Sequence, residues 1–200
     1  TRATELDSQN ASTWSALGLV QLMQDNQDEA LESLTKSINF GSQWAGDYMN
    51  RGIIYYQRHN YRGALADYDK AVSLSPEDMQ CYYNRGMLRY EVGDYNRSLE
   101  DFTKAIDLAP GKMEIYYHRG LVQLQLRQWQ DAVNDFERII EQYPYFIPAY
   151  YLTAQAESSL GHDKKAYELR QKAYNLEMNK DSVQSLQTNM QLAQSQPQQR

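Results

Sequence analysis

The chain has 200 residues, a formal net charge of −6 and only five prolines, a composition that favours helices over strands and tight turns. The acidic balance argues against nucleic acid as a partner, because a phosphate-binding surface needs clustered Lys and Arg. No stretch of about eighteen apolar residues could cross a membrane, and the single cysteine, Cys81, has no second cysteine for a disulfide or a zinc-binding pair.

The start of the chain, TRATELDS, aligns with the segments around Ser37 and Ala71, which follow it at a constant interval. Neither an initiator methionine nor a signal-peptide pattern stands among these residues. We expect residues 1–8 to be the remnant of a preceding repeat helix, in a fragment of a longer protein. The sequence therefore leaves the compartment unknown.

A single repeating frame runs through the chain without insertion or deletion. Glycines recur in it at constant spacing, at Gly18, Gly52, Gly86 and Gly120, and Ala154 takes the fifth place. Other positions of the frame hold aromatic, small and proline residues: Trp14, Tyr48, Tyr82, Tyr116 and Tyr150; Ala30, Ala64, Ser98, Ala132 and Ala166; Pro76, Pro110 and Pro144. An aromatic residue and a glycine four apart share one helix face, and the glycine lets a second helix approach closely.

This frame resembles the tetratricopeptide repeat (TPR), a unit of about 34 residues in which an aromatic residue, glycine, alanine, a second aromatic residue and proline recur. The resemblance covers residues 9–180. It implies an all-α fold, a right-handed α-α superhelix (TPR solenoid) of antiparallel helical hairpins. The expected repeats are residues 9–44, 45–78, 79–112, 113–146 and 147–180.

Each repeat is expected to contain two helices. The first helices are predicted near residues 11–24, 45–58, 78–92, 112–126 and 147–160, and the second near 27–40, 61–74, 95–108, 129–142 and 163–178. For residues 181–200 we expect a capping helix near 181–193, with Val183, Leu186 and Met190 at helical spacing, followed by a disordered Gln-rich tail.

Three repeats carry an arginine directly before the glycine, and the same three carry an aspartate that an antiparallel hairpin would place opposite. The pairs are Arg51 with Asp67, Arg85 with Asp101, and Arg119 with Asp135; the first repeat has Leu17 with Ser33, and the fifth has Thr153 with Leu169. Because the two charges appear together or not at all, we expect structural ion pairs inside the central hairpins. The alternative is that the arginines extend along the apolar face to solvent.

In the TPR family the first helices line the concave side and hold peptides or partner helices. Carried to this sequence, the resemblance implies a Tyr- and Asn-rich groove with almost no charge. Its expected partner-binding residues are Met49, Asn50, Ile53, Tyr56, Tyr83, Asn84, Met87, Tyr90, Tyr117, His118, Leu121 and Tyr151. The alternative is that part of this stripe only packs the first helices against one another.

The sequence offers no catalytic constellation, cofactor motif or metal-ligand spacing around its three histidines. A non-catalytic scaffold that binds a protein or peptide is the leading interpretation. Two others stay open: the chain is the non-catalytic arm of a larger enzyme or assembly, or it is a structural solenoid that associates with itself through exposed ends of the stack.

Overall fold

A computed structural model describes residues 10–179 of the chain. This part contains helices and turns and no strand. It divides into two compact units, the first ending at Pro110 and the second beginning at Gly111. The predicted remnant of a helix at residues 1–8, the predicted capping helix and the Gln-rich tail lie outside the described residues.

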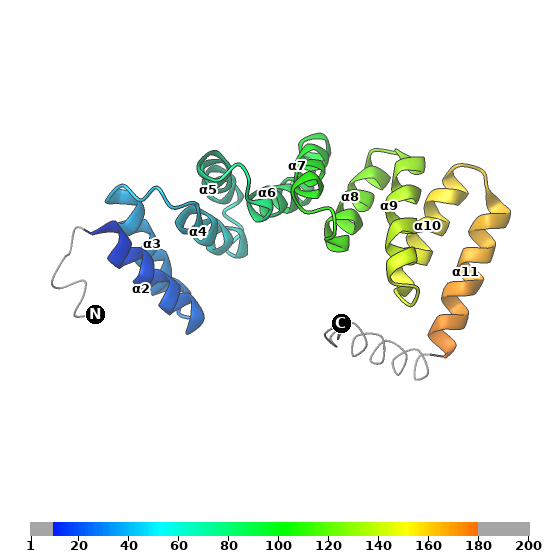
Figure 1. The fold of residues 1–200 in the computed structure, drawn as a ribbon, viewed down its shortest axis with the longest axis horizontal. Coiled ribbons are helices and arrows are strands. Elements are labelled where there is room, and N and C mark those ends of the chain that lie inside the picture. Colours follow the sequence, from blue (N-terminus) through cyan, green and yellow to red (C-terminus); the bar gives the residue numbers. More distant parts are fainter. Residues whose placement is uncertain (1–9, 180–200) are drawn as a thin grey trace, which may run out of the picture. The chain divides into compact units, whose positions relative to one another are not determined.

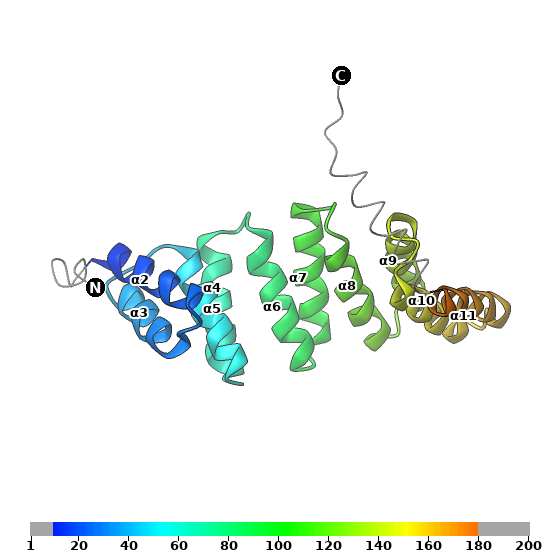
Figure 2. The ribbon, with the colours of Figure 1, turned by 90° about the horizontal axis from the view of Figure 1, so that it is seen from below.

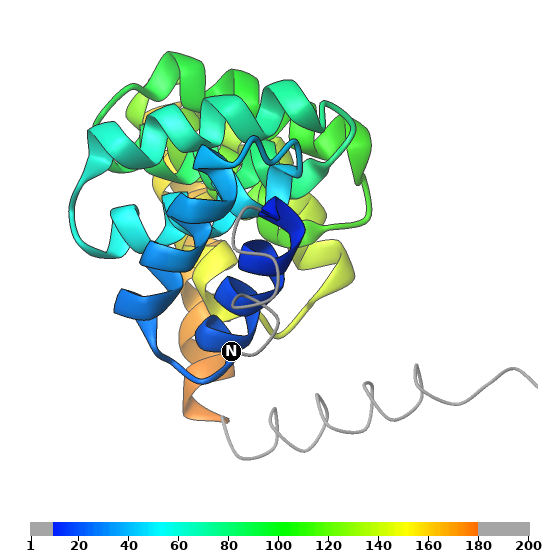
Figure 3. The ribbon, with the colours of Figure 1, turned by 90° about the vertical axis from the view of Figure 1, so that its left-hand side faces the viewer.

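The first unit is a stack of three helical hairpins (Figures 1 and 2). In Figure 3 the first hairpin, in the darkest blues, faces the viewer. Within a hairpin α2 packs on α3, α4 on α5 and α6 on α7, while α3 packs on α4 and α5 on α6 between hairpins. The helices are α2 Ala11–Met23, α3 Gln27–Asn39, α4 Ala45–Gln57, α5 Tyr61–Leu74, α6 Met79–Glu91 and α7 Tyr95–Leu108.

The second unit continues the same pattern with two hairpins (Figure 1). Here α8 packs on α9, α9 on α10, and α10 on α11. The helices are α8 Met113–Gln125, α9 Trp129–Gln142, α10 Ile147–Ser159 and α11 Asp163–Met178. Every helix expected between residues 11 and 178 is present with ends that agree to one residue, so the all-α fold of helical hairpins is confirmed.

The turn inside each hairpin of residues 10–179 has the same backbone geometry. A residue with positive φ recurs at the same turn position of every repeat, at Asp25, His59, Gly93, Arg127 and Gly161. The next residue's N–H donates to a carbonyl five residues back, as from Asn60 to Tyr55 and from Asp94 to Arg89, both at 2.8 Å. This is the bond that closes a helix ending in a left-handed residue. Only two of the five positions are glycine, so the tertiary contacts of the hairpin hold three other residues in this conformation.

The glycines of the repeat mark where the two helices of a hairpin meet most closely. A Cβ atom added to Gly120 would lie 2.6 Å from Cε1 of Phe136, and one added to Gly52 would lie 2.7 Å from Cε1 of Tyr68. The Phe136 ring is completely buried and has nowhere to move. In the fifth repeat the aromatic position is occupied by the exposed Arg170, which explains why Ala154 is tolerated there.

Substitution of Gly120 by alanine should therefore destabilise the second unit. Forcing a methyl group against Phe136 costs about 1–3 kcal/mol, of which the better helix propensity of alanine returns at most about 1 kcal/mol. Denaturant unfolding of Gly120→Ala measures the loss. Gly111→Ala is the matched control, because nothing lies within 4 Å of its added Cβ; equal stability of the two variants would contradict the close contact.

Candidate functional site

Arginine and aspartate meet within each of the three central hairpins. Arg51 donates from Nε to Oδ2 of Asp67 at 2.8 Å and from Nη2 to Oδ1 at 2.7 Å. Arg119 makes the same two bonds to Asp135, at 2.8 and 2.7 Å. The aspartates are buried and the arginines only slightly exposed. Such two-point bonds fix the register of the hairpin as well as neutralising both charges.

The pair in the third repeat belongs to a larger network. Arg85 donates to Asp101 through Nε and Nη2, and its Nη1 donates to Asp69 of the preceding hairpin at 2.8 Å. Arg89 also donates to Asp101, at 2.8 Å. Two guanidinium groups thus share one buried carboxylate, and the network joins α5, α6 and α7.

These contacts remove nearly all charge from the first helices of the hairpins, α2, α4, α6, α8 and α10. Helix α2 has no charged residue. Asp47 of α4 is buried and accepts hydrogen bonds from Ser15 and Ser37, while Glu157 of α10 is buried against Lys165 and His162. The remaining exposed charges on these five helices are Glu91 and Glu114. The face that they present is therefore close to neutral.

In the first unit this neutral face contains a cavity of about 320 Å³. The predicted residues Ile53, Tyr56, Tyr83, Asn84 and Met87 line it, together with Gln57, Tyr68 and Leu88. The Asn84 Oδ1 atom accepts a hydrogen bond from Gln80 at 3.1 Å, whereas its Nδ2 group bonds no residue between 10 and 179. Burial raises the pKa of the Tyr56 phenol, helped by the nearby Glu91, so this group is a neutral donor at physiological pH.

The other predicted residues of the first unit do not line this cavity. Met49 packs against the buried cluster of Ala45, Ala71 and Cys81. This contact agrees with the alternative that part of the predicted stripe serves helix packing. Asn50 is half-buried on α4. The Tyr90 ring lies 5.7 Å from that of Tyr95 at the turn of its hairpin.

Predicted residues of the second unit have different surroundings. The Tyr117 ring meets those of Phe136 and Phe146 edge-on, with centroids 6.2 and 5.7 Å away. Leu121 and His118 are half-buried on α8, and burial lowers the pKa of the histidine while Glu114 opposes the shift.

Tyr151, on α10, is 39% exposed and donates its hydroxyl hydrogen bond to Glu177 at 3.0 Å. This bond raises the pKa of the Tyr151 phenol. The Tyr151 hydroxyl is therefore linked to α11, the second helix of its own hairpin.

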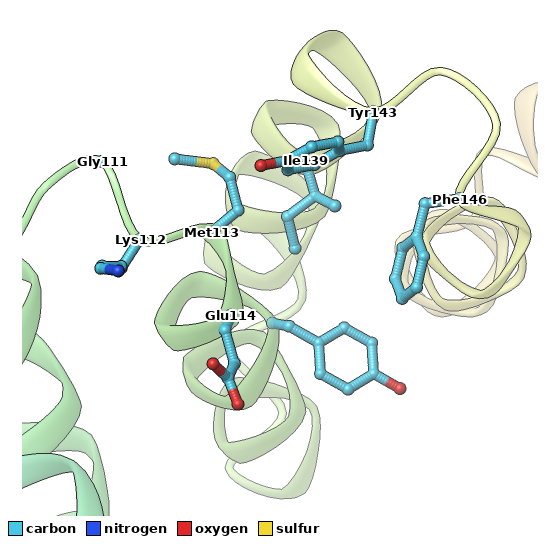
Figure 4. A pocket seen from close by; sticks show the side chains of 8 residues that line it. Gly111, Lys112, Met113, Glu114, Ile139, Tyr143 and Phe146 are labelled. Atoms are coloured by element: carbon cyan, nitrogen blue, oxygen red, sulfur yellow. The ribbon is translucent and has the colours of Figure 1, made fainter. Parts of the chain in front are cut away.

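A second cavity, of about 580 Å³, lies entirely within the second unit (Figure 4). Tyr117 is its only predicted member; the others are Gly111, Lys112, Met113, Glu114, Ile139, Tyr143 and Phe146. The sequence did not point to them because they come from the ends of three helices rather than from one face. The frame position of Phe146 is held by Trp44, Asp78 and Lys112 in the earlier repeats, so an aromatic residue there gave no clear signal.

A recurring cation also escaped the sequence analysis. Lys36 lies 4.3 Å from the Trp14 ring centre, Arg138 4.6 Å from that of Tyr116, and Lys172 5.1 Å from that of Tyr150. The three rings occupy one position of the repeating frame, and the three cations occupy another. These second-helix cations stabilise the aromatic residues of the frame through their ring faces and take no part in either cavity.

A metal site and a membrane-spanning helix each have structural requirements, and the described residues meet neither. Among residues 10–179, no group of three or more His, Cys, Asp or Glu side chains is arranged to hold a metal ion. No helix in this part of the chain is long and apolar enough to span a membrane.

The repeated hairpins, with glycine against an aromatic residue, define a helical repeat protein. Residues 52–93 match a family model described as TPR repeat, and residues 83–146 match one described as tetratricopeptide repeat. Residues 52–146 therefore carry tetratricopeptide repeats, and each unit of the described residues is built from the tandem helical hairpins of this repeat.

Solved structures share this fold at low sequence identity. A crystal structure of MamA protein is 21% identical with a TM-score of 0.78, over 86% of this chain and 94% of that one. YrrB, described as a TPR protein with an unusual peptide-binding site, is 19% identical with a TM-score of 0.84, over 94% and 97%. MamA from Desulfovibrio magneticus RS-1 is 20% identical with a TM-score of 0.77, over 86% and 97%. No curated protein matches the chain in sequence.

The ion pairs make a prediction about stability. Asp135→Ala leaves Arg119 largely buried without its carboxylate and should cost about 3–5 kcal/mol of unfolding free energy. The double variant Arg119→Leu, Asp135→Leu removes both charges and should lose clearly less, as the uncharged Leu17 and Ser33 of the first hairpin suggest. Denaturant unfolding compares them, and equal losses would contradict a buried bridge. Asp101→Ala, which deprives two arginines, should lose more than Asp135→Ala.

Proposed function

We propose that this chain is a non-catalytic protein-interaction scaffold that binds an extended, uncharged segment of a partner protein on the first helices. The observation that carries the proposal is the cavity of about 320 Å³ in the first unit, five of whose residues were expected from the sequence to contact a partner. Its size is at the lower end of ligand pockets, about 300–1,000 Å³. An aliphatic side chain of the bound segment would enter it.

The cavity combines apolar walls with a few polar groups that can orient a peptide. Ile53, Met87 and Leu88 supply the apolar surface, and Met87 can adapt its shape to different side chains. Asn84 can donate from Nδ2 to a carbonyl group of the peptide backbone, and Asn50 occupies the equivalent place one repeat earlier. Tyrosines around the cavity give a broad contact area at a small cost in side-chain entropy.

The near absence of exposed charge favours an uncharged partner segment. The arginines of α4 and α6 are engaged with aspartates inside the hairpins. They are therefore not available to hold an acidic tail or a terminal carboxylate. Selectivity would come from shape, burial of apolar surface and a small number of hydrogen bonds.

Selection from a library of random peptides tests this proposal. We expect selected peptides to lack charged residues at their centre and to bind Asn84→Ala about 5–10 times more weakly than the wild type, for one lost hydrogen bond. Asn96→Ala is the matched control, because Asn96 is exposed on the second helix α7. Peptides rich in Lys, Arg, Asp or Glu, or peptides indifferent to both Asn84→Ala and Met87→Ala, would disprove the site.

The affinity of the selected peptides should also depend little on salt. Exposed charge pairs weaken as the screening length falls from about 10 Å at 0.1 M salt to about 3 Å at 1 M, whereas apolar contacts do not. Calorimetric titrations at 0.1 and 1 M sodium chloride should give dissociation constants within about twofold to threefold. A loss of tenfold or more at 1 M would show that recognition is electrostatic.

A further inference from the structure

We propose that the cavity at the N-terminal ends of α8 and α10 is a second docking site, which takes an aromatic side chain from an uncharged segment of a partner protein. This site lies wholly in the second unit and shares no residue with the cavity of the first unit. It therefore goes beyond the proposed function and does not depend on it.

Three aromatic rings surround the space (Figure 4). Tyr143 and Phe146 are 47% and 37% exposed, so both rings keep apolar surface in contact with water. The Tyr117 ring is held by its edge-on contacts with Phe136 and Phe146. A further ring entering the cavity beside them would gain the offset or edge-to-face contacts that aromatic groups prefer, and would cover apolar surface now in water.

The inner wall of the cavity is apolar and already ordered. Met113 and Ile139 are 8% and 3% exposed, so the wall needs little rearrangement to receive a ligand. The Met113 thioether can make a favourable contact with an aromatic ring. The volume of about 580 Å³ falls in the middle of the range for ligand pockets and can hold a ring together with the adjoining backbone.

The rim carries one charge of each sign, so it favours a neutral occupant. The Lys112 ammonium makes no ion pair or hydrogen bond with any of residues 10–179, and it can lie over the face of an entering ring. Glu114, on the first turn of α8, offers a carboxylate on the same rim that can accept a hydrogen bond. An indole ring uses both groups, because its face attracts the cation and its N–H is a donor. Tryptophan is therefore the preferred aromatic residue.

The test uses N-acetyl-tryptophanamide as a probe and the whole chain labelled in its Met and Ile methyl groups. We expect saturable NMR shifts at Met113 and Ile139 in the millimolar range, with N-acetyl-leucinamide binding at least about fivefold more weakly. Ile53 and Met87 report separately on the first cavity. Shifts of Met113 and Ile139 with the tryptophan probe test the second cavity, whereas shifts of Ile53 and Met87 with the leucine probe test the first, so failure of one site is distinguishable from failure of the other.

Variants at exposed positions complete the test. Tyr143→Ala with Phe146→Ala should weaken tryptophanamide binding at least about tenfold, whereas Tyr167→Ala, at a 61% exposed tyrosine of α11, should not. Lys112→Gln should weaken binding of the tryptophan probe but not of the leucine probe. Absence of saturable shifts at Met113 and Ile139, equal affinity for the two probes, or full binding by the double alanine variant would overturn the proposal.

Discussion

The close approach of two helices inside each central hairpin governs the rest of this structure. An Arg-Gly pair of the first helix meets an Asp-aromatic pair of the second, as Arg119 and Gly120 meet Asp135 and Phe136. The glycine admits the ring, and the helices come so close that the adjoining arginine is largely removed from water. A guanidinium group in that position needs its charge compensated, and the aspartate next to the ring does so with two hydrogen bonds.

The terminal hairpins keep the repeat but change this contact. In the first, Leu17 and Ser33 replace the ion pair, and a buried Asp47 from the next hairpin binds Ser15 and Ser37 instead. In the last, Thr153 donates to the Ala149 carbonyl of its own helix. There Glu157, buried between Lys165 and His162, connects α10 with α11. Different hairpins therefore make their buried polar contacts at different repeat positions, whereas the helices begin and end at the same repeat positions throughout.

The difference between constant helix ends and variable polar contacts explains which features the sequence could predict. Helix ends and the three Arg-Asp pairs follow from local periodicity and from the antiparallel hairpin, so constant spacing was sufficient for both. The contact from Arg85 to Asp69 crosses between hairpins, and its geometry depends on how neighbouring hairpins stack. Met49, a predicted groove residue, packs against the buried Ala45, Ala71 and Cys81, a contact that periodicity alone does not specify. The walls of the second cavity, Met113, Tyr143 and Phe146, are brought together only by the stacking of α8, α9 and α10.

The internal ion pairs also determine what recognition can depend on. A buried pair adds little net stability compared with apolar residues of similar size, and Leu17 shows that the frame accepts an apolar residue at the arginine position. What the pairs do provide is register, because a hairpin that slips by one residue loses both bonds at once. Since Arg51, Arg85 and Arg119 are committed to that task, the first helices leave mainly tyrosine, asparagine, methionine and isoleucine for the partner contacts that we propose. Uncharged side chains of this kind would select a partner by shape and apolar burial, and the two proposed sites, one in each unit, differ in the side chain that each would accept.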